Sequence, residues 1–587
     1  MKEKEQNKKK GLSRENLRIL KRLFGYLAKE RKLLIVVTIL ILVSTVCHVF
    51  SSYLLRPIIN DAIIPGNISK LITLLVTLAI VYFAGTFSVW LQYRVLNNTG
   101  QRTVARLRKD LFDKMEKLPL RYFDKHQTGD LMSRYTNDMD RVSEVLTETL
   151  SDMFTNILTL FATVAIMLFI SPILTLTTVL IVPLMIWVAS MVVKRSRIYF
   201  KEQQRVMGET NGYVEEIISG QKVVKLFSHE QKAEADFDVH NKELRQKAEK
   251  AQLFSGLMMP LMQNMNTLNF VFVTIVGGLL TIFRGFDLGG LAAFLQYSRQ
   301  FGRPINELSA QYNTLQGAIA GAERIFRIID ETPEDIHDTP NPTLLDTPPK
   351  GMVKFENVSF EYEKDVPVLK DISFEAFPGK KIALVGSTGA GKTTIFNILP
   401  RFYDIQQGNI FVDGIPQHNI TRTQLRQSMV LVLQDVHLFN DTVRENIRYG
   451  RLDATDAEVE AAAKLAAAHN FITRLPHGYD TKLSDDGANL SQGQRQLLSI
   501  ARAAVANPPV ILLDEATSDV DTETEKLIQQ GMDQLMRDRT TLVIAHRIST
   551  IMNADEILVI EHGQIIERGN HETLAGQKGR YWELLKG

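Results

Sequence analysis

The sequence predicts a multidomain protein in which an all-α transmembrane domain of six helices, residues 1–330, precedes an α/β P-loop domain, residues 351–587. Three observations support this architecture. Long apolar segments occur only in the first half of the chain. A glycine-rich loop at residues 386–393 follows a short apolar strand, and a second apolar strand, residues 510–513, ends in two carboxylates. A chain of 587 residues has room for about three to four domains of ordinary size, so both parts can have cores of their own.

The bulk composition excludes several classes of protein. The net charge of +2 leaves no basic footprint for nucleic acid. Cys47 is the only cysteine, so the chain holds neither an intrachain disulfide nor a multi-cysteine metal site. Because Cys47 lies within an apolar run, we expect it to be a small buried residue. The N-terminus is basic but lacks a small-residue cleavage site, which argues against a cleaved signal peptide.

Five segments of the first half are long and apolar enough to span a membrane, since about 20 helical residues cover the hydrocarbon core. They are residues 33–55, 71–96, 153–170, 173–193 and 253–283. A sixth segment, residues 288–315, carries Gln296, Gln300, Arg299 and Arg303 among its apolar residues. A helix of this kind cannot face lipid on all sides, so we expect it to line a cavity or to pack on partners.

The distribution of lysine and arginine predicts the orientation. Residues 97–152 and 194–252 are long and rich in both, whereas the connections on the opposite side are short and hold only Arg56, Lys70 and Arg284. Basic loops stay in the cytoplasm. Six spans return the chain to its starting side, so we expect both termini and the P-loop domain to be cytoplasmic in a multi-pass protein of the cell membrane.

Two short breaks interrupt the long cytoplasmic segments, at residues 122–130 and 219–227. Each is compatible with a short transverse helix that docks on the nucleotide domain, or with a solvated turn at the tip of a helical hairpin. Pattern alone does not decide between these two structures.

An amphipathic helix precedes the first span. Leu20, Leu23, Phe24 and Leu27 recur at helical spacing, with basic residues on the other face. This pattern is typical of a helix that lies in the membrane interface.

A connector separates the two halves at residues 331–350. It is acidic, lacks periodicity and is rich in proline. Its prolines are Pro333, Pro340, Pro342, Pro348 and Pro349. We therefore place the domain boundary here.

The loop at residues 386–393 has the pattern Gly, four residues, Gly-Lys-Thr, between an apolar strand and a helix. This pattern is a phosphate-binding loop, because glycines let backbone N–H groups point at phosphate oxygens and the helix N-terminus favours negative charge. Lys392 supplies a positive charge for the outer phosphates, and the Thr393 hydroxyl is a candidate ligand of Mg²⁺. The predicted nucleotide-binding residues here are Gly386, Ser387, Thr388, Gly389, Ala390, Gly391, Lys392, Thr393 and Thr394.

The strand at residues 510–513 leads into Asp514 and Glu515. Asp514 is placed to hold Mg²⁺, often through water, and Glu515 is the candidate base that polarises the attacking water. Taken alone, either carboxylate could be a strand-end cap. The nearby phosphate loop makes that alternative improbable.

Taken together and in this order, the motifs resemble an ABC exporter half-transporter, in which six spans are fused to one ATP-binding cassette. Ser491, Gly493 and Gln494 resemble the family signature, which usually has Gly where Gln492 stands. The resemblance implies further roles. Tyr362 stands where the family stacks an aromatic ring on adenine, Gln434 matches the loop glutamine that touches Mg²⁺ and the membrane half, and His546 matches the histidine that contacts the γ-phosphate.

Two further segments match the family with differences or in part. Residues 518–521 occupy the D-loop, where Asp519 and Val520 replace the usual Ala-Leu, and residues 483–487 stand where exporters place a loop that senses the membrane helices. By the same resemblance the breaks at residues 122–130 and 219–227 are expected to be coupling helices.

The resemblance implies an ATP hydrolase that exports amphipathic compounds, either drugs or lipids, by alternating access, with ATP and Mg²⁺ as cofactors. In this family the signature of one cassette closes over ATP on the loop of another, so the working unit is expected to be a dimer of chains, either identical or different. A dedicated lipid flippase and an ATP-gated channel are the alternatives. Arg303 is either a ligand for an anionic head group or a packing arginine near the inner leaflet.

Overall fold

A computed structural model gives the structure of the chain and describes residues 14–338, 342–346, 348–484, 486–514, 521–545 and 548–586. The internal contacts divide the chain into two compact units. The helical unit holds the chain up to Asp113 together with Gly129–Asp330, and the sheet unit holds Lys114–Thr128 together with Glu331–Gly587. The short segment Lys114–Thr128 therefore lies among the helices in sequence but belongs to the sheet unit by its contacts.

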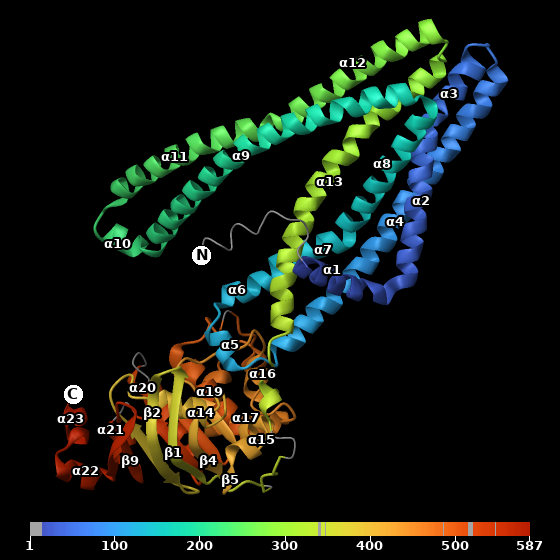
Figure 1. Ribbon diagram of the computed structural model, residues 1–587. Helices are drawn as coiled ribbons and strands as arrows, with labels where there is room; N and C mark the ends of the chain where they lie inside the picture. Colours follow the sequence, from blue (N-terminus) through green and yellow to red (C-terminus); the bar gives the residue numbers. More distant parts are fainter. Residues whose placement is uncertain are drawn as a thin grey trace. The chain divides into compact units, whose positions relative to one another are not determined.

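The helical unit is built from helices, several of which are long (Figure 1). They are α1 (Arg14–Leu27), α2 (Arg31–Tyr53), α3 (Leu55–Pro57), α4 (Ile68–Met115), α6 (Thr128–Ser133), α7 (Met139–Glu144), α8 (Leu150–Ile170), α9 (Pro172–Ser219), α10 (Gln221–Leu226), α11 (Glu230–Gly256), α12 (Met258–Arg284) and α13 (Leu288–Ile329). Shorter 3-10 or π-helical turns continue these helices at Ala28–Glu30, Ile58–Ile63, Arg134–Asp138 and Val145–Thr149. Helices α9 and α11 run side by side, as do α8 and α13.

Five helical stretches in the described part are long and apolar enough to cross a membrane. They are Arg14–Ile63, Ile68–Met115, Thr128–Ile170, Pro172–Ser219 and Glu230–Arg284. Each contains one of the five predicted apolar segments, so those predictions are confirmed. Cys47 within the first is half-buried rather than fully buried.

The sixth predicted segment forms α13, which packs on its neighbours through polar groups as expected. The Tyr297 hydroxyl donates a hydrogen bond to the carbonyl of Val49 at 2.6 Å, and Asn269 on α12 donates to Ser298 at 3.1 Å. The helix begins after Asp287, whose carboxylate caps it by accepting the Gly290 N–H at 2.5 Å. Such a side-chain cap satisfies one of the free N–H groups at a helix start.

Helix α1 is amphipathic, but its apolar face differs in part from the predicted one. Ile19, Leu23 and Leu27 are buried, whereas Phe24 is exposed. The buried residues pack toward α13, and Arg22 forms an ion pair with Asp330 at 2.6 Å. Contacts distant in sequence, rather than periodicity alone, decide which stripe of this helix is covered.

The sheet unit contains two sheets. Its strands are β1 (Val353–Glu363), β2 (Val366–Ala376), β3 (Lys381–Val385), β4 (Gln407–Val412), β5 (Ile415–Pro416), β6 (Met429–Val432), β7 (Val510–Asp514), β8 (Thr540–Ile544), β9 (Glu556–Glu561) and β10 (Gln564–Gly569). One sheet is antiparallel with the order β2-β1-β4-β5, and the other has the order β10-β9-β3-β8-β7-β6. In the larger sheet the ladders are parallel except for that between β9 and β10.

Helices of the sheet unit complete two hydrophobic cores. They are α5 (Leu120–Asp124), α14 (Lys392–Ile398), α15 (Arg422–Gln427), α16 (Val443–Arg448), α17 (Asp456–Leu465), α18 (His469–Ile472), α19 (Gln492–Ala506), α20 (Thr522–Met536), α21 (Ile548–Met552), α22 (His571–Gln577) and α23 (Arg580–Lys586), with 3-10 turns at Glu334–His337, Gln417–Asn419 and Gly478–Asp480. Along β3, Ile382 and Leu384 enter one core while Ala383 and Val385 enter the other. Side chains alternate between the faces of a strand, so β3 is buried on both sides.

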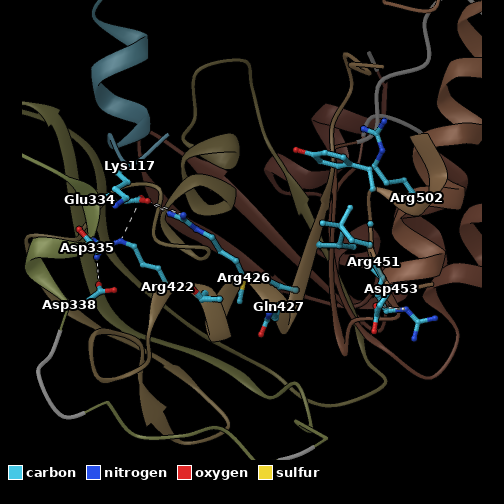
Figure 2. A pocket seen from close by; sticks show the side chains of 17 residues that line it. Lys117, Glu334, Asp335, Asp338, Arg422, Arg426, Gln427, Arg451, Asp453 and Arg502 are labelled. Atoms are coloured by element: carbon cyan, nitrogen blue, oxygen red, sulfur yellow. Dashed lines mark hydrogen bonds and ion pairs between the residues drawn. The ribbon is translucent and has the colours of Figure 1, made fainter. Parts of the chain in front are cut away.

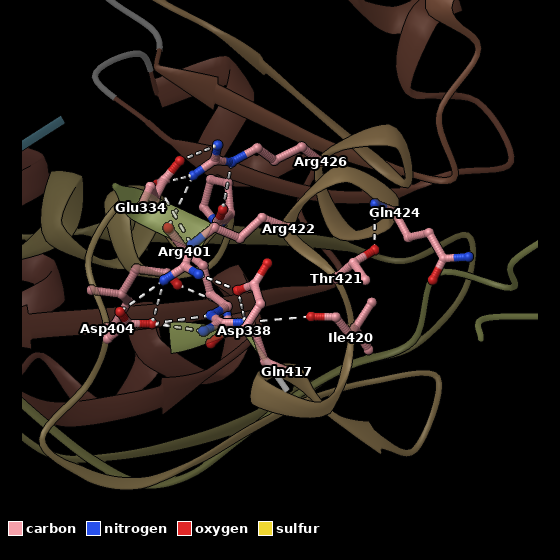
Figure 3. A network of polar contacts seen from close by, with 12 residues as sticks. Glu334, Asp338, Arg401, Asp404, Gln417, Ile420, Thr421, Arg422, Gln424 and Arg426 are labelled. Carbon is pink, nitrogen blue, oxygen red and sulfur yellow. Dashed lines mark hydrogen bonds and ion pairs between the residues drawn. The ribbon is translucent and has the colours of Figure 1, made fainter. Parts of the chain in front are cut away.

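An ion-pair network fixes the start of the connector within the sheet unit (Figure 3). Glu334 accepts two hydrogen bonds from Arg426, and Asp338 pairs with Arg422. Arg422 also donates to Asp404 at 2.8 Å, and its side chain is only 7% exposed. The first residues of the connector are thus ordered by charge pairs and do not form a free linker.

Candidate nucleotide-binding site

The parallel sheet brings the predicted site residues to one edge. The register aligns Leu384 on β3, Ile544 on β8 and Asp514 on β7. The loop at residues 386–393 leaves β3 directly after this row, and Gln434 follows β6 by two residues and is exposed. Carboxyl ends of parallel strands share one edge, which is where open α/β sheets bind ligands.

The backbone of the loop requires glycine at two positions. Gly389 and Gly391 have φ of +81° and +105°, in the left-handed region that side chains rarely adopt. A Cβ on Gly391 would lie 2.7 Å from Cδ2 of Leu369. Ser387, Thr388 and Gly389 are exposed, so the tip of the loop is open to solvent.

Lys392 lies over the loop and is largely buried. Its exposed fraction is 7%, and its Nζ donates to the carbonyls of Gly386 and Ser387 at 2.8 and 2.9 Å. Burial lowers the pKa of Lys392, and the nearby Asp514 carboxylate opposes this shift. The ammonium group is therefore held by two neutral carbonyls, and a phosphate oxygen would offer it a stronger partner.

Tyr362 and Thr394 lie beside the loop. The Tyr362 hydroxyl is 3.4 Å from the Thr394 hydroxyl and accepts a hydrogen bond from Asn397 at 3.0 Å. The ring makes edge-to-face contacts with Phe360 and Tyr403, with centroids 4.8 and 4.9 Å away. The tyrosine is half-buried and held in place, whereas the neighbouring Thr393 side chain is exposed and free to reach a ligand.

Ser491 and Gln494 form a reciprocal cap at the start of α19. The Ser491 hydroxyl accepts the Gln494 N–H at 3.3 Å, and the Gln494 side chain accepts the Ser491 N–H at 3.0 Å. In the described part of the chain these polar groups bond to each other and not to the loop at residues 386–394. Gly493 is buried, and Gln492 is exposed.

Several predicted residues lie outside the described residues. These are Glu515, His546 and residues 518–520 of the expected D-loop. Asp521, which ends that segment, is described and caps α20 by accepting the Thr524 N–H at 2.9 Å. Asp514 ends β7 at the expected edge, as noted above.

The contacts that hold the first break, residues 122–130, in place are not predicted by the sequence. Residues 120–124 form α5, and Asp124 accepts a hydrogen bond from the Tyr403 hydroxyl. Arg121 donates to the carbonyl of Tyr362 at 3.1 Å, which ties α5 to the strand that carries the predicted adenine-stacking ring. Burial and the Asp124 carboxylate raise the pKa of Tyr403. No local pattern signals these pairs, because their partners are more than 200 residues apart.

The second break also forms a short helix, α10, within the helical unit. Val223, Leu226 and Phe227 there are 58%, 78% and 63% exposed. The break is thus a short exposed helix between the paired helices α9 and α11, and its docking on the nucleotide domain stays a prediction.

The sheet unit has a hollow away from the loop at residues 386–393 (Figure 2). Its volume is about 1030 Å³, and its walls include Lys117, Arg422, Arg451 and Arg502 with several carboxylates. None of its lining residues comes from residues 386–394. Cavity size alone would therefore point away from the phosphate-binding motif.

We predict that Lys392→Met weakens ATP binding by about ten- to a hundredfold, because a charge-assisted hydrogen bond contributes about 1.5–3 kcal/mol. Binding of a fluorescent ATP analogue to the purified protein measures the change. Lys464→Met, at an exposed position on α17, is the matched control. Equal affinities for the wild type and Lys392→Met would contradict the assignment.

Comparison with known proteins extends over both units. The family model described as the ABC transporter transmembrane region matches residues 34–305, and the one described as ABC transporter matches residues 369–518. An uncharacterized ABC transporter ATP-binding protein, YfiC, of Bacillus subtilis is 43% identical over 583 residues, which are 99% of this chain and 96% of that protein.

Other relatives are named for an activity. A fatty acid ABC transporter ATP-binding/permease protein of Mycobacterium bovis is 44% identical, over 88% of this chain and 81% of its own length. An ATP-dependent lipid A-core flippase of Syntrophus aciditrophicus is 36% identical, over 91% and 88%. The solved structure of a bacterial Atm1-family ABC exporter with ATP bound matches with a TM-score of 0.75 and 30% identity, over 95% of this chain and 98% of that one.

Proposed function

Because this chain belongs to the ABC transporter family, as a half-transporter that fuses one membrane domain to one ATP-binding domain, we propose that it exports amphipathic drugs or lipids across the cell membrane. The protein is a multi-pass membrane ATPase that couples hydrolysis to transport. The observation that best supports the proposal is the joining of apolar helices to a sheet edge that gathers the phosphate loop and Asp514.

In the proposed site the loop N–H groups and Lys392 hold the phosphates of ATP, and Tyr362 stacks on adenine. The exposed Thr393 hydroxyl and the Asp514 carboxylate are hard oxygen donors of the kind that Mg²⁺ prefers, so the residues present fit this ion. When bound, Mg²⁺ neutralises charge on the phosphates. Gln434 is proposed to complete this shell.

The hydrolysis step needs two further groups. Glu515 is proposed to orient and polarise the attacking water, and His546 to contact the γ-phosphate. Positioning and electrostatic stabilisation account for most of phosphoryl-transfer catalysis, so no side chain of the site needs to form a covalent bond with the phosphate.

The half-transporter architecture implies a dimer with another chain. We propose that Ser491, Gly493 and Gln494 of one chain close over ATP on the loop of the other, which agrees with the self-capped, exposed start of α19. The dimer then has two ATP sites and twelve spans. Both homodimer and heterodimer fit, since Gln492 and the altered D-loop resemble subunits of heterodimeric exporters. High ATPase activity of this chain expressed alone would argue against an obligatory second subunit.

The short helices α5 and α10 are proposed to carry closure of the ATP-binding domains to the membrane helices. Helix α5 is held within the sheet unit by hydrogen bonds from Tyr403 to Asp124 and from Arg121 to the carbonyl of Tyr362. The exposed apolar side chains of α10 offer a docking surface for an ATP-binding domain. The ATP-binding domains and both termini are accordingly proposed to be cytoplasmic.

Transport into proteoliposomes tests the proposal. Full-length protein, with ATP supplied outside, should accumulate a fluorescent hydrophobic cation or a fluorescent lipid against its gradient, and Lys392→Met should not. Equilibration without accumulation would indicate a channel. Movement of the fluorescent lipid without the cation would favour the dedicated flippase, which the similarity to a lipid A-core flippase makes the second candidate.

A further inference from the structure

A polar hollow lies inside the helical unit. It has a volume of about 600 Å³ and lies among α2, α4, α8 and α13. This size falls within the range of about 300–1,000 Å³ typical of small-molecule pockets. Its lining includes the acidic and basic side chains of His48, Asp152, Arg299, Arg303 and Glu307. Charged groups are costly at membrane depth and are usually paired. Charges in the hollow that lack a partner therefore indicate the charge of a ligand that could bind there.

Two of these charges neutralise each other. Arg303 and Glu307 lie one helical turn apart on α13, with Nε and Oε1 2.7 Å apart. Arg303 is therefore paired through Nε with a carboxylate of its own helix, and its side chain is 83% exposed.

Arg299 has no carboxylate within ion-pair distance among the described residues. Its guanidinium lies over the Phe270 ring, 4.2 Å from the centroid. A cation over a ring is attracted to the ring face, and none of the five N–H donors of Arg299 bonds to a described residue. The donors remain open to an anionic ligand.

Asp152, on α8, likewise has no lysine or arginine within ion-pair distance in the part of the chain that the structure describes. Its Oδ1 accepts a hydrogen bond from the Tyr93 hydroxyl at 3.0 Å. No described residue donates a hydrogen bond to its Oδ2. The hollow thus carries one open cation and one open anion on different helices.

A third polar group also lacks a protein partner. The hydroxyl oxygen of Thr45, a residue only 3% exposed, lines the hollow without a hydrogen bond from the described residues. Buried polar atoms in folded proteins almost always have a partner, so the Thr45 hydroxyl is a candidate contact for water or a bound ligand.

We propose that this hollow binds the head group of a zwitterionic amphipath, with Arg299 on its anionic group and Asp152 on its cationic group. The inference rests on the proposed export function, since it names the substrate class. A purely anionic ligand would be repelled by Asp152, and a purely cationic one by Arg299. Only a molecule with both charges satisfies both side chains.

Direct binding without ATP tests the proposal. Three probes, each with 16 carbons in its fatty chain when the carboxyl carbon of palmitate is counted, are titrated into purified full-length protein by calorimetry: hexadecylphosphocholine, palmitate and hexadecyltrimethylammonium. We expect the zwitterion to bind about tenfold more tightly than either singly charged probe, as one extra charge contact at intermediate dielectric allows.

The variants have opposite expected effects. Asp152→Asn should remove the preference over palmitate, and Arg299→Gln the preference over the cation. Asp152→Glu and Arg299→Lys keep the charges and should keep the order, which separates recognition from misfolding. Arg245→Gln with Glu249→Gln, an exposed pair on α11, is the matched control.

Two results would overturn the site: palmitate or the cation binding as tightly as the zwitterion, or an unchanged order in Asp152→Asn and Arg299→Gln. Since no ATP is present, failure of vesicle transport with this binding order intact would reject the proposed pump and keep the site. Transport of the zwitterion, combined with an unchanged order of probe affinities in both variants, would reject the binding site and keep the proposed pump.

Discussion

Replacing Glu515 with Gln should leave ATP binding intact and lower the rate of ATP hydrolysis by about a hundredfold or more, the usual contribution of a general base. The amide has nearly the same shape as the carboxylate but cannot accept the proton of water. The loop, Lys392 and Asp514 are untouched, so nucleotide affinity should stay within about twofold of the wild-type value.

Phosphate release and binding of a fluorescent ATP analogue, measured on the same purified sample, test this separation. Glu572→Gln, an exposed glutamate on α22, controls for a general effect of losing a carboxylate. Hydrolysis near the wild-type rate in Glu515→Gln would show that another group polarises the water. Loss of binding would instead place Glu515 in the binding shell.

Replacing Arg422 with Ala should lower the stability of the sheet unit by about 3 kcal/mol, the lower end of the range for breaking a buried ion pair. Arg422 holds Asp338 and Asp404, and the variant leaves both carboxylates with fewer partners. The value lies at the lower end because Asp404 is 48% exposed and Arg401 also contacts both acids.

For a unit of this size the change corresponds to a fall of about 6–12 °C in the unfolding temperature. Calorimetry of the full-length protein measures it, and hydrogen exchange should show faster exchange at residues 334–338. Arg568→Ala, which removes a surface pair with Glu556, should cost about 1 kcal/mol or less. Equal shifts in the two variants would show that the network does not stabilise the connector.

Much of the architecture follows from local patterns. The five apolar segments are confirmed as long helices, and the strand before residue 386 is buried on both faces as its continuous apolar run suggests. The glycines of the loop are required by positive φ and close contacts, which is why this motif can be read without a structure. Chemical roles beyond these, including those of Gln434 and Glu515, stay predictions.

Other features depend on partners that no sequence window contains. The two breaks were compatible with either turns or helices, and the helix α5 is held by Tyr403 and Tyr362. The buried stripe of α1 depends on α13. Each outcome was settled by contacts formed during folding.

The sequence by itself determined that membrane-spanning helices are joined to a nucleotide-binding domain. Helix length, hydropathy and a phosphate-binding loop are local properties, set by backbone sterics and by the cost of exposing apolar surface. Only the tertiary structure decided that Lys114–Thr128 joins the sheet unit and that Asp152 and Arg299 stay open beside one hollow. Pairing between charges is decided by distances in space, and those distances exist only once distant helices have packed.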